Sequence, residues 1–188
     1  MAQAWYQGGL SIFDFTDSTN PKEIAFFDRG PLDETALMSG GYWSTYWYNG
    51  HIYGAEIARG IDVFKLLPSE YLSKNEIAAA TEVRFEEFNA QRQPQVSWRA
   101  SSAVARAYVD QLVRSESIPS SRVSAVDSVL SRVDALQRDD DSEVVSIVDD
   151  LKELVSTIEV DAGSAEGRNA ERLQALAETL DARAASLR

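Results

Sequence analysis

The sequence of 188 residues contains no cysteine and only one histidine, His51. Without cysteine it cannot form a disulfide framework, a thiolate zinc site or a thiol nucleophile, and a single histidine excludes a metal centre that needs two imidazoles. The apolar runs are only a few residues long, and the first residues lack the basic and apolar segments of a secretory signal. We therefore expect no membrane insertion and no signal peptide in this chain.

Basic residues are also scarce, because 18 of them stand against 30 acidic residues and leave a formal net charge of -12. Such a chain repels phosphate backbones instead of releasing their counterions. Nucleic acid is therefore not expected among its partners.

The composition changes abruptly near residue 70. Residues 5–71 hold 14 of the 18 aromatic side chains, and no glycine occurs in residues 61–162. Aromatic residues broken by glycine favour strands and turns, whereas a glycine-free stretch rich in Ala, Leu, Val and Glu favours helix. The sequence predicts a segregated α+β protein with sheets in residues 1–68, a capped helix and linker in 69–96 and helices in 97–188.

The sheet region contains an internal repeat. The segment Gly9-Leu10-Ser11-Ile12-Phe13 returns 51 residues later as Gly60-Ile61-Asp62-Val63-Phe64. An aromatic strand is predicted upstream of each copy, at Trp5-Tyr6 and at Ile52-Tyr53. A strand unit that repeats every 40 to 50 residues is typical of β-propeller blades.

Two further segments fit this repeat. Residues 22–27 read as an outgoing strand after a turn-forming segment that ends in Asn20-Pro21. Residues 46–53 read as a hairpin, because Asn49-Gly50 tolerates the positive φ angles of a type I′ turn.

These residues resemble a known family. The run from Trp5 to Asp17, followed by Asn20-Pro21, is similar to an LVIVD repeat, and the resemblance covers about residues 4–67. The second copy departs from the family pattern, because Lys65 stands where the pattern has Asp. The resemblance implies a partial β-propeller of about one and a half blades in a secreted or cell-surface protein, with no catalytic residues to assign.

A partial propeller leaves one blade face and one strand edge uncovered. We expect the missing blades to be supplied by the rest of a longer protein, of which this chain is the C-terminal portion, by another copy or by another protein subunit. The chain's own helices are the remaining possibility.

The helical region begins at Ser73, which forms a predicted capping box with Glu76, and this helix is expected to reach about residue 90. Further helices are predicted at 97–115, after Pro119, after Asp139 to Asp141, and before the end of the chain, where leucines recur at 173, 176, 180 and 187. The apolar stripes predict an antiparallel α-helical bundle, with a coiled-coil oligomer as the alternative.

Two groups of residues are candidates for binding. Glu56, Arg59 and Asp62 cluster around the second copy of the repeat and could hold an anionic ligand or serve as an acid and base pair, although a salt-bridged loop gives the same pattern. The second group could form an interaction surface, although packing between blades would bury the same side chains. This group comprises Tyr42, Trp43, Tyr46, Trp47 and Tyr48.

The sequence thus predicts a noncatalytic binding or scaffold module that needs no metal or cofactor. One alternative is a hydrolase that uses Glu56 and Asp62. The other is a structural spacer or oligomerisation device built from the helices.

Overall fold

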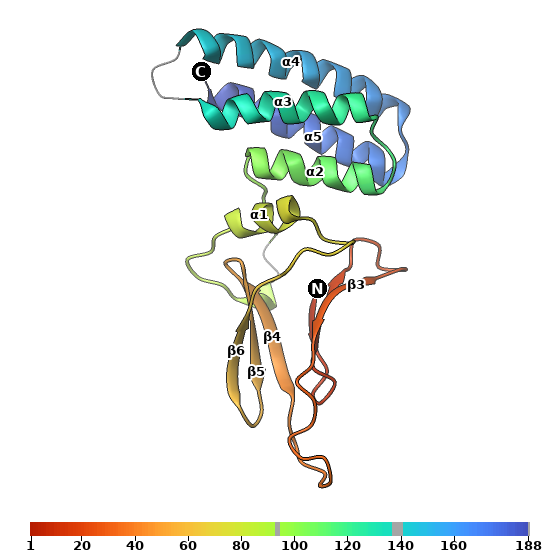
Figure 1. The fold of residues 1–188 in the computed structure, drawn as a ribbon, viewed down its shortest axis with the longest axis vertical. Helices are drawn as coiled ribbons and strands as arrows, with labels where there is room; N and C mark the ends of the chain where they lie inside the picture. Colours follow the sequence, from red (N-terminus) through yellow and green to blue (C-terminus); the bar gives the residue numbers. More distant parts are fainter. Residues whose placement is uncertain (93–94, 137–140, 188) are drawn as a thin grey trace. The chain divides into compact units, whose positions relative to one another are not determined.

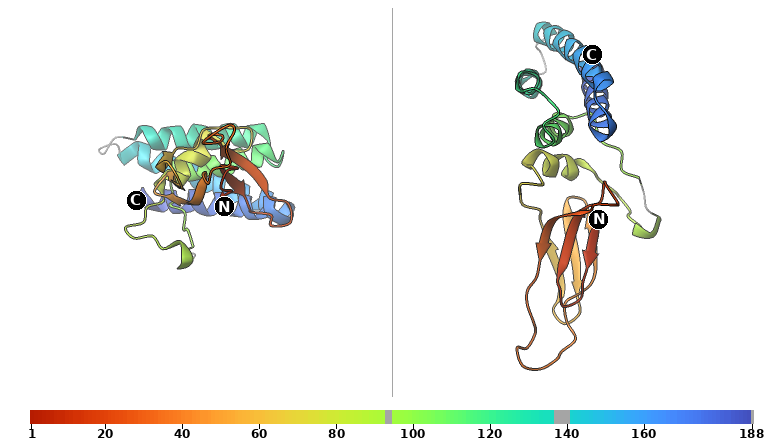
Figure 2. Two further views of the ribbon diagram at one scale, coloured as in Figure 1. Left: turned by 90° about the horizontal axis from the view of Figure 1, so that it is seen from below. Right: turned by 90° about the vertical axis from the view of Figure 1, so that its right-hand side faces the viewer.

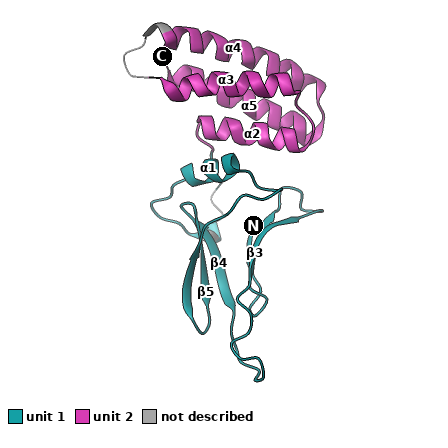
Figure 3. Cartoon of the chain, in the orientation of Figure 1, with its two compact units in different colours: residues 1–97 teal, residues 98–188 magenta. Residues whose placement is uncertain are grey.

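The computed structural model describes residues 1–92, 95–136 and 141–187. The chain divides into two compact units, Met1–Ser97 and Trp98–Arg188 (Figure 3). Its described residues form two three-stranded antiparallel sheets followed by five α-helices (Figure 1). The predicted α+β class is therefore confirmed.

The first sheet consists of β1 (Ala2–Ala4), β2 (Leu10–Asp14) and β3 (Lys22–Phe27), in that order. The third strand lies where it was predicted. Trp5 and Tyr6 were predicted to form a strand, but they lie in the turn after β1, where the Trp5 amide donates to the Gly9 carbonyl. This tight turn takes the chain directly from β1 into β2.

The second sheet consists of β4 (Tyr42–Tyr48), β5 (His51–Glu56) and β6 (Gly60–Phe64). Asn49 and Gly50 connect β4 to β5 with φ angles of 48° and 84°. Both angles are positive, as a type I′ turn requires, so the predicted hairpin is confirmed. The register shifts between Tyr42 and Ser44, which places a bulge at Trp43.

Strand pairing follows the sequence repeat residue by residue. In the first sheet Ala2 pairs with Ile12 and Ala4 with Leu10; 51 residues later Tyr53 pairs with Val63 and Ala55 with Ile61. Strands β1 and β2 therefore correspond to β5 and β6. The first sheet adds β3 after this pair, whereas the second sheet adds β4 before it.

The two sheets pack against each other through their inner faces. Leu10 and Ile12 from β2 share a buried cluster with Tyr42 and Ile52 of the second sheet. The chain backbones also meet, because Tyr6 and Tyr42 exchange two amide-to-carbonyl hydrogen bonds of 3.1 and 2.9 Å. Figure 1 shows the sheets side by side, and the right-hand view of Figure 2 shows one in front of the other.

Helix α1 (Lys74–Glu82) begins at the predicted capping box, in which Ser73 accepts from the Glu76 amide and the Glu76 carboxylate accepts from the Ser73 amide. The helix ends at Glu82 and not near residue 90. It ends early because the residues after Glu82 form hydrogen bonds with the turn between β4 and β5, which is distant in the sequence. The Phe85 amide donates to Asn49 Oδ1 over 2.8 Å, and Arg84 donates to the Asn49 carbonyl over 2.6 Å.

The second unit consists of α2 (Ser102–Arg114), α3 (Ser120–Ala135), α4 (Asp141–Ser164) and α5 (Gly167–Ser186). Helix α2 begins at Ser102, after its Ser101 cap and five residues later than predicted, and α3 follows Pro119 as expected. The predicted cap residues Asp139 and Asp140 lie outside the described residues. In the described part of the chain, no helix combines the length and apolar character needed to cross a membrane.

These four helices pack around one core. Neighbouring pairs are α2 with α3, α3 with α4, α4 with α5, and α5 with α2. The fully enclosed side chains come from all four helices and include three of the four predicted stripe leucines: Leu112, Leu130, Ile147, Leu151, Ile158, Leu173, Leu176 and Leu180. The fourth stripe leucine, Leu187, follows the end of α5 and is half-buried.

Candidate functional site

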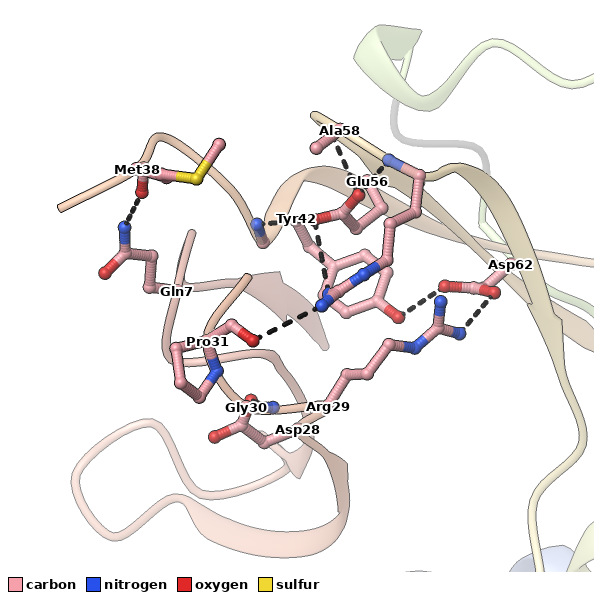
Figure 4. A network of polar contacts seen from close by, with 12 residues as sticks. Gln7, Asp28, Arg29, Gly30, Pro31, Met38, Tyr42, Glu56, Ala58 and Asp62 are labelled. Carbon is pink, nitrogen blue, oxygen red and sulfur yellow. Dashed lines mark hydrogen bonds and ion pairs between the residues drawn. The ribbon is translucent and has the colours of Figure 1, made fainter. Parts of the chain in front are cut away.

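The carboxylate of Glu56 closes a turn at the end of β5. Its Oε1 atom accepts from the Gly41 amide over 2.7 Å, and its Oε2 atom accepts from the amides of Ala58 and Arg59 (Figure 4). The side chain is almost completely enclosed. Burial favours the neutral acid, but the three backbone amides outweigh it and hold the pKa of Glu56 below its ordinary value.

Asp62, on β6, lies between two partners from different parts of the chain. The Tyr42 hydroxyl donates to its Oδ2 atom over 2.6 Å, and Arg29 Nη2 donates to its Oδ1 atom over 2.7 Å. The hydrogen bond from Tyr42 and the charge of Arg29 lower the pKa of Asp62, against the opposing effect of desolvation. Burial and the adjacent Asp62 carboxylate raise the pKa of Tyr42, so its hydroxyl remains protonated and keeps donating.

Arg59, the third candidate ligand residue, turns toward the loop between the sheets. Its Nη1 atom lies 3.9 Å from Glu56 Oε1, and its Nη2 atom donates to the Pro31 carbonyl over 3.4 Å. Glu56, Arg59 and Asp62 thus hold the connection between β3 and β4 onto the second sheet.

This arrangement has a clear chemical consequence. An acid and base pair needs two groups whose pKa values are pushed in opposite directions, so that one of them holds a proton at neutral pH. The pKa values of Glu56 and Asp62 are both lowered, and both carboxylates accept hydrogen bonds from the protein itself. Both are anions at neutral pH, and neither is a proton donor.

The five aromatic residues predicted as an interaction surface do not share one environment. Tyr42 is buried, with 1% of its surface exposed, and forms part of the core between the sheets. Trp47 packs against the same core, and Tyr48 is half-buried. Trp43 is 67% exposed and Tyr46 is 49% exposed. The bulge at Trp43 causes this division, since it interrupts the alternation of side chains along β4.

The outer face of the second sheet is apolar and open. Cross-strand pairs place Tyr46, Tyr53 and Val63 in one row and Ala55 and Ile61 in the next, on the side opposite Ile52. We call these five residues the Ile61 face. Ile61 is 74% exposed and Val63 is 57% exposed.

Among the described residues, the segment after α1 covers the hairpin end of this sheet surface. Beside Tyr53, the Tyr48 ring lies 6.1 Å from the Phe88 ring, and its hydroxyl donates to the Phe85 carbonyl over 2.9 Å. Tyr46, Ile61 and Val63 remain exposed in spite of this contact.

The outer face of the first sheet is also aromatic. Ser11 and Phe26 pair directly across β2 and β3, and Trp5 lies over Ser11, donating from Nε1 to its hydroxyl over 2.9 Å. The Trp5 ring makes an edge contact with Phe13 at 6.4 Å. We call Trp5, Ser11, Phe13 and Phe26 the Phe26 face.

No protein-family model, curated protein sequence or solved structure matches this chain.

Several of these site residues were not identified from the sequence. Arg29 lies 33 positions from Asp62, and no local pattern connects the two residues. Ile61 and Val63 could have been found, because they occupy the positions of Leu10 and Ile12 in the repeat. The repeat by itself does not indicate which copy has its apolar face covered.

Proposed function

We propose that this chain is a noncatalytic binding or scaffold module, the C-terminal portion of a secreted or cell-surface protein of the LVIVD-repeat propeller kind. In this proposal the two sheets are partial blades of one propeller, and an antiparallel helical bundle follows them. The extracellular location rests on the resemblance of residues 4–67 to that repeat.

The shared register of the two sheets supports partial propeller blades. When β1 and β2 are superposed on β5 and β6 through the repeat, β4 supplies a strand before the pair and β3 supplies a strand after it. The composite unit has four antiparallel strands, which is the number in a propeller blade. Each sheet would then be one blade that lacks a terminal strand.

The open Ile61 face is the observation that carries the binding role. Solvent-exposed apolar side chains gathered on one sheet face are typical of a surface that is covered by a partner. In this chain the substitution of one or two of them should leave the fold intact, because Ile61 and Val63 contribute little to the core between the sheets.

A capture experiment tests this role. The full chain, the double variant Ile61→Glu with Val63→Glu, and the control Leu37→Glu are immobilised and exposed to medium and cell-envelope extract of the producing cells. Leu37 is 97% exposed and lies outside both sheets. We expect a protein that is retained by the wild type and by the control and lost by the double variant. Equal retention by all three chains, or no retention, would refute the binding role.

The two other functions receive different support. A hydrolase based on Glu56 and Asp62 is the weaker candidate, because both carboxylates are ionised and occupied by internal donors. A spacer role for the helices is supported by the core that α2 to α5 share, which favours a self-contained bundle over a coiled-coil oligomer.

A further inference from the structure

Equivalent positions of the repeat have opposite exposure in the two sheets. Leu10 and Ile12 are buried, at 3% and 9% exposure, because the second sheet covers them. Their counterparts Ile61 and Val63 point to the corresponding side of their own sheet and are exposed. In register, the Ile61 face thus corresponds to a surface that is covered inside this molecule, and Ile61 and Val63 keep the aliphatic character of Leu10 and Ile12.

The interface between the two sheets also shows which surface packs on the side that carries Leu10 and Ile12. It joins the Leu10 side of the first sheet to the opposite side of the second sheet, where Tyr42 and Phe64 lie. Phe64 corresponds to Phe13 in the repeat, and Phe13 lies on the Phe26 face. We call the side of each sheet that carries Leu10 or Ile61 its front, and the side that carries Phe13 or Phe64 its back. The internal contact joins the front of the first sheet to the back of the second. The Phe26 face is the back of the first sheet.

One chain thus carries both halves of a further interface. The internal contact sets Leu10, Ile12 and Phe27 of the first sheet against Tyr42, Ile52 and Phe64 of the second. The two open faces repeat this pairing, with Ile61 and Val63 on the front and Phe13, Trp5 and the 75%-exposed Phe26 on the back.

We propose that a second copy of this chain seats its Phe26 face on the Ile61 face and continues the front-to-back stacking of the sheets. This proposal rests on the proposed function and names the partner. The interface uses two different surfaces, so each added copy leaves one face of each kind open. Association therefore continues beyond a dimer, to a closed ring or to an open chain of copies.

Complementary variants of the full chain test this geometry. Ile61→Glu with Val63→Glu blocks the front and keeps the Phe26 face, whereas Phe26→Glu blocks the back and keeps the Ile61 face. Sedimentation equilibrium over a concentration series is measured for the wild type, for each variant, for an equimolar mixture of the variants and for the Leu37→Glu control. Circular dichroism verifies that each variant is folded. If a glutamate variant does not fold, the corresponding alanine variant replaces it.

We expect the wild type and the control to form species larger than a dimer. Each blocked variant alone should associate at least about a hundredfold more weakly, and the mixture should stop at a heterodimer, because it contains one intact face of each kind.

A wild type that stays monomeric over the whole series would overturn the proposal. Self-association of either blocked variant at wild-type strength would do the same, since it would indicate a symmetric contact. If the wild type is monomeric but still captures another protein through the Ile61 face, the binding function stands and the second copy is excluded as its partner.

Discussion

The two units have similar lengths, residues 1–97 and 98–188, but they enclose their apolar side chains to very different extents. Among the described residues, the helical unit places seventeen residues in one buried cluster, whereas the cluster between the sheets has four. Large exposed hydrophobic residues show the reverse distribution, with fifteen in the first unit and four in the second. Similar lengths of chain thus give one sealed core and one layered core with open faces.

The difference follows from the geometry of the two kinds of element. An amphipathic helix has a single apolar stripe, and four such helices can turn their stripes toward a common centre. A sheet of alternating apolar residues has two faces, so two stacked sheets bury two faces and leave two open. In this molecule the open pair consists of the Ile61 face and the Phe26 face.

The largest expected effect tests how well the helical unit is sealed. Leu151 of α4 is fully buried, so Leu151→Ala should create a cavity and lower the free energy of unfolding by about 3 kcal/mol. Val160→Ala, on the exposed side of the same helix, should change it by less than about 0.5 kcal/mol. Urea unfolding followed by far-ultraviolet circular dichroism measures both. Similar losses in the two variants would mean that α4 is not anchored by this core.

The next effect tests how closely the sheets approach each other. Gly41 has a φ of 82°, and a Cβ atom there would lie 1.8 Å from the Tyr6 carbonyl oxygen. Gly60 has a φ of 98°, but its Cβ position is open. Gly60→Ala should cost about 1 kcal/mol from backbone strain alone, and Gly41→Ala about 3 kcal/mol, because the backbones must also separate. Urea unfolding followed by tryptophan fluorescence measures the difference; equal costs would show that the Tyr6 contact adds nothing.

Local patterns in the sequence were enough to predict much of this architecture. The capping box at Ser73, the Asn49-Gly50 hairpin, the Lys22–Phe27 strand and the leucine stripe of α5 each depend on residues close together in the chain. Such features are set by backbone preference and periodicity, and the structure confirms them.

Features that depend on distant residues could not be predicted in the same way. Helix α1 ends at Glu82 because Asn49, more than thirty positions earlier, holds Arg84 and Phe85 outside the helix. Tyr42 is buried because Gly54 on the neighbouring strand leaves room for its ring, since a Cβ atom there would lie 2.7 Å from it. No periodicity in the sequence indicates either contact.

A smaller effect concerns acid, which should weaken the first unit through Glu56. Its folded-state pKa lies below the ordinary value of 4.5, so its contribution to stability is complete above that value and is lost as the pH falls through the folded pKa. The urea midpoint measured by tryptophan fluorescence should therefore fall as the pH is lowered below about 4.5. Glu56→Gln should lower the midpoint at neutral pH and reduce this fall, whereas Glu70→Gln, at an exposed position, should do neither. A Glu56→Gln curve parallel to that of the wild type would show that the three amides do not depend on the charge.

The smallest effect concerns the hairpin end of the second sheet, where the segment after α1 covers the outer surface. The Asn49 side chain accepts from the Phe85 amide and donates to its carbonyl over 3.0 Å, so Asn49→Gly removes both hydrogen bonds while the Gly-Gly sequence still favours the type I′ turn. The substitution should lower the stability of the segment after α1 by about 1 kcal/mol. The opening should stay local, because Tyr48 and Arg84 keep their own contacts with this region. Trypsin should then cleave after Arg84 about fivefold faster, as quantified by mass spectrometry. The control Asn20→Gly, in the turn of the first sheet, should leave that cleavage rate unchanged. If Asn49→Gly also leaves it unchanged, ring packing between Phe88 and Tyr48 is sufficient to hold the cover, and the two hydrogen bonds determine only where the helix ends.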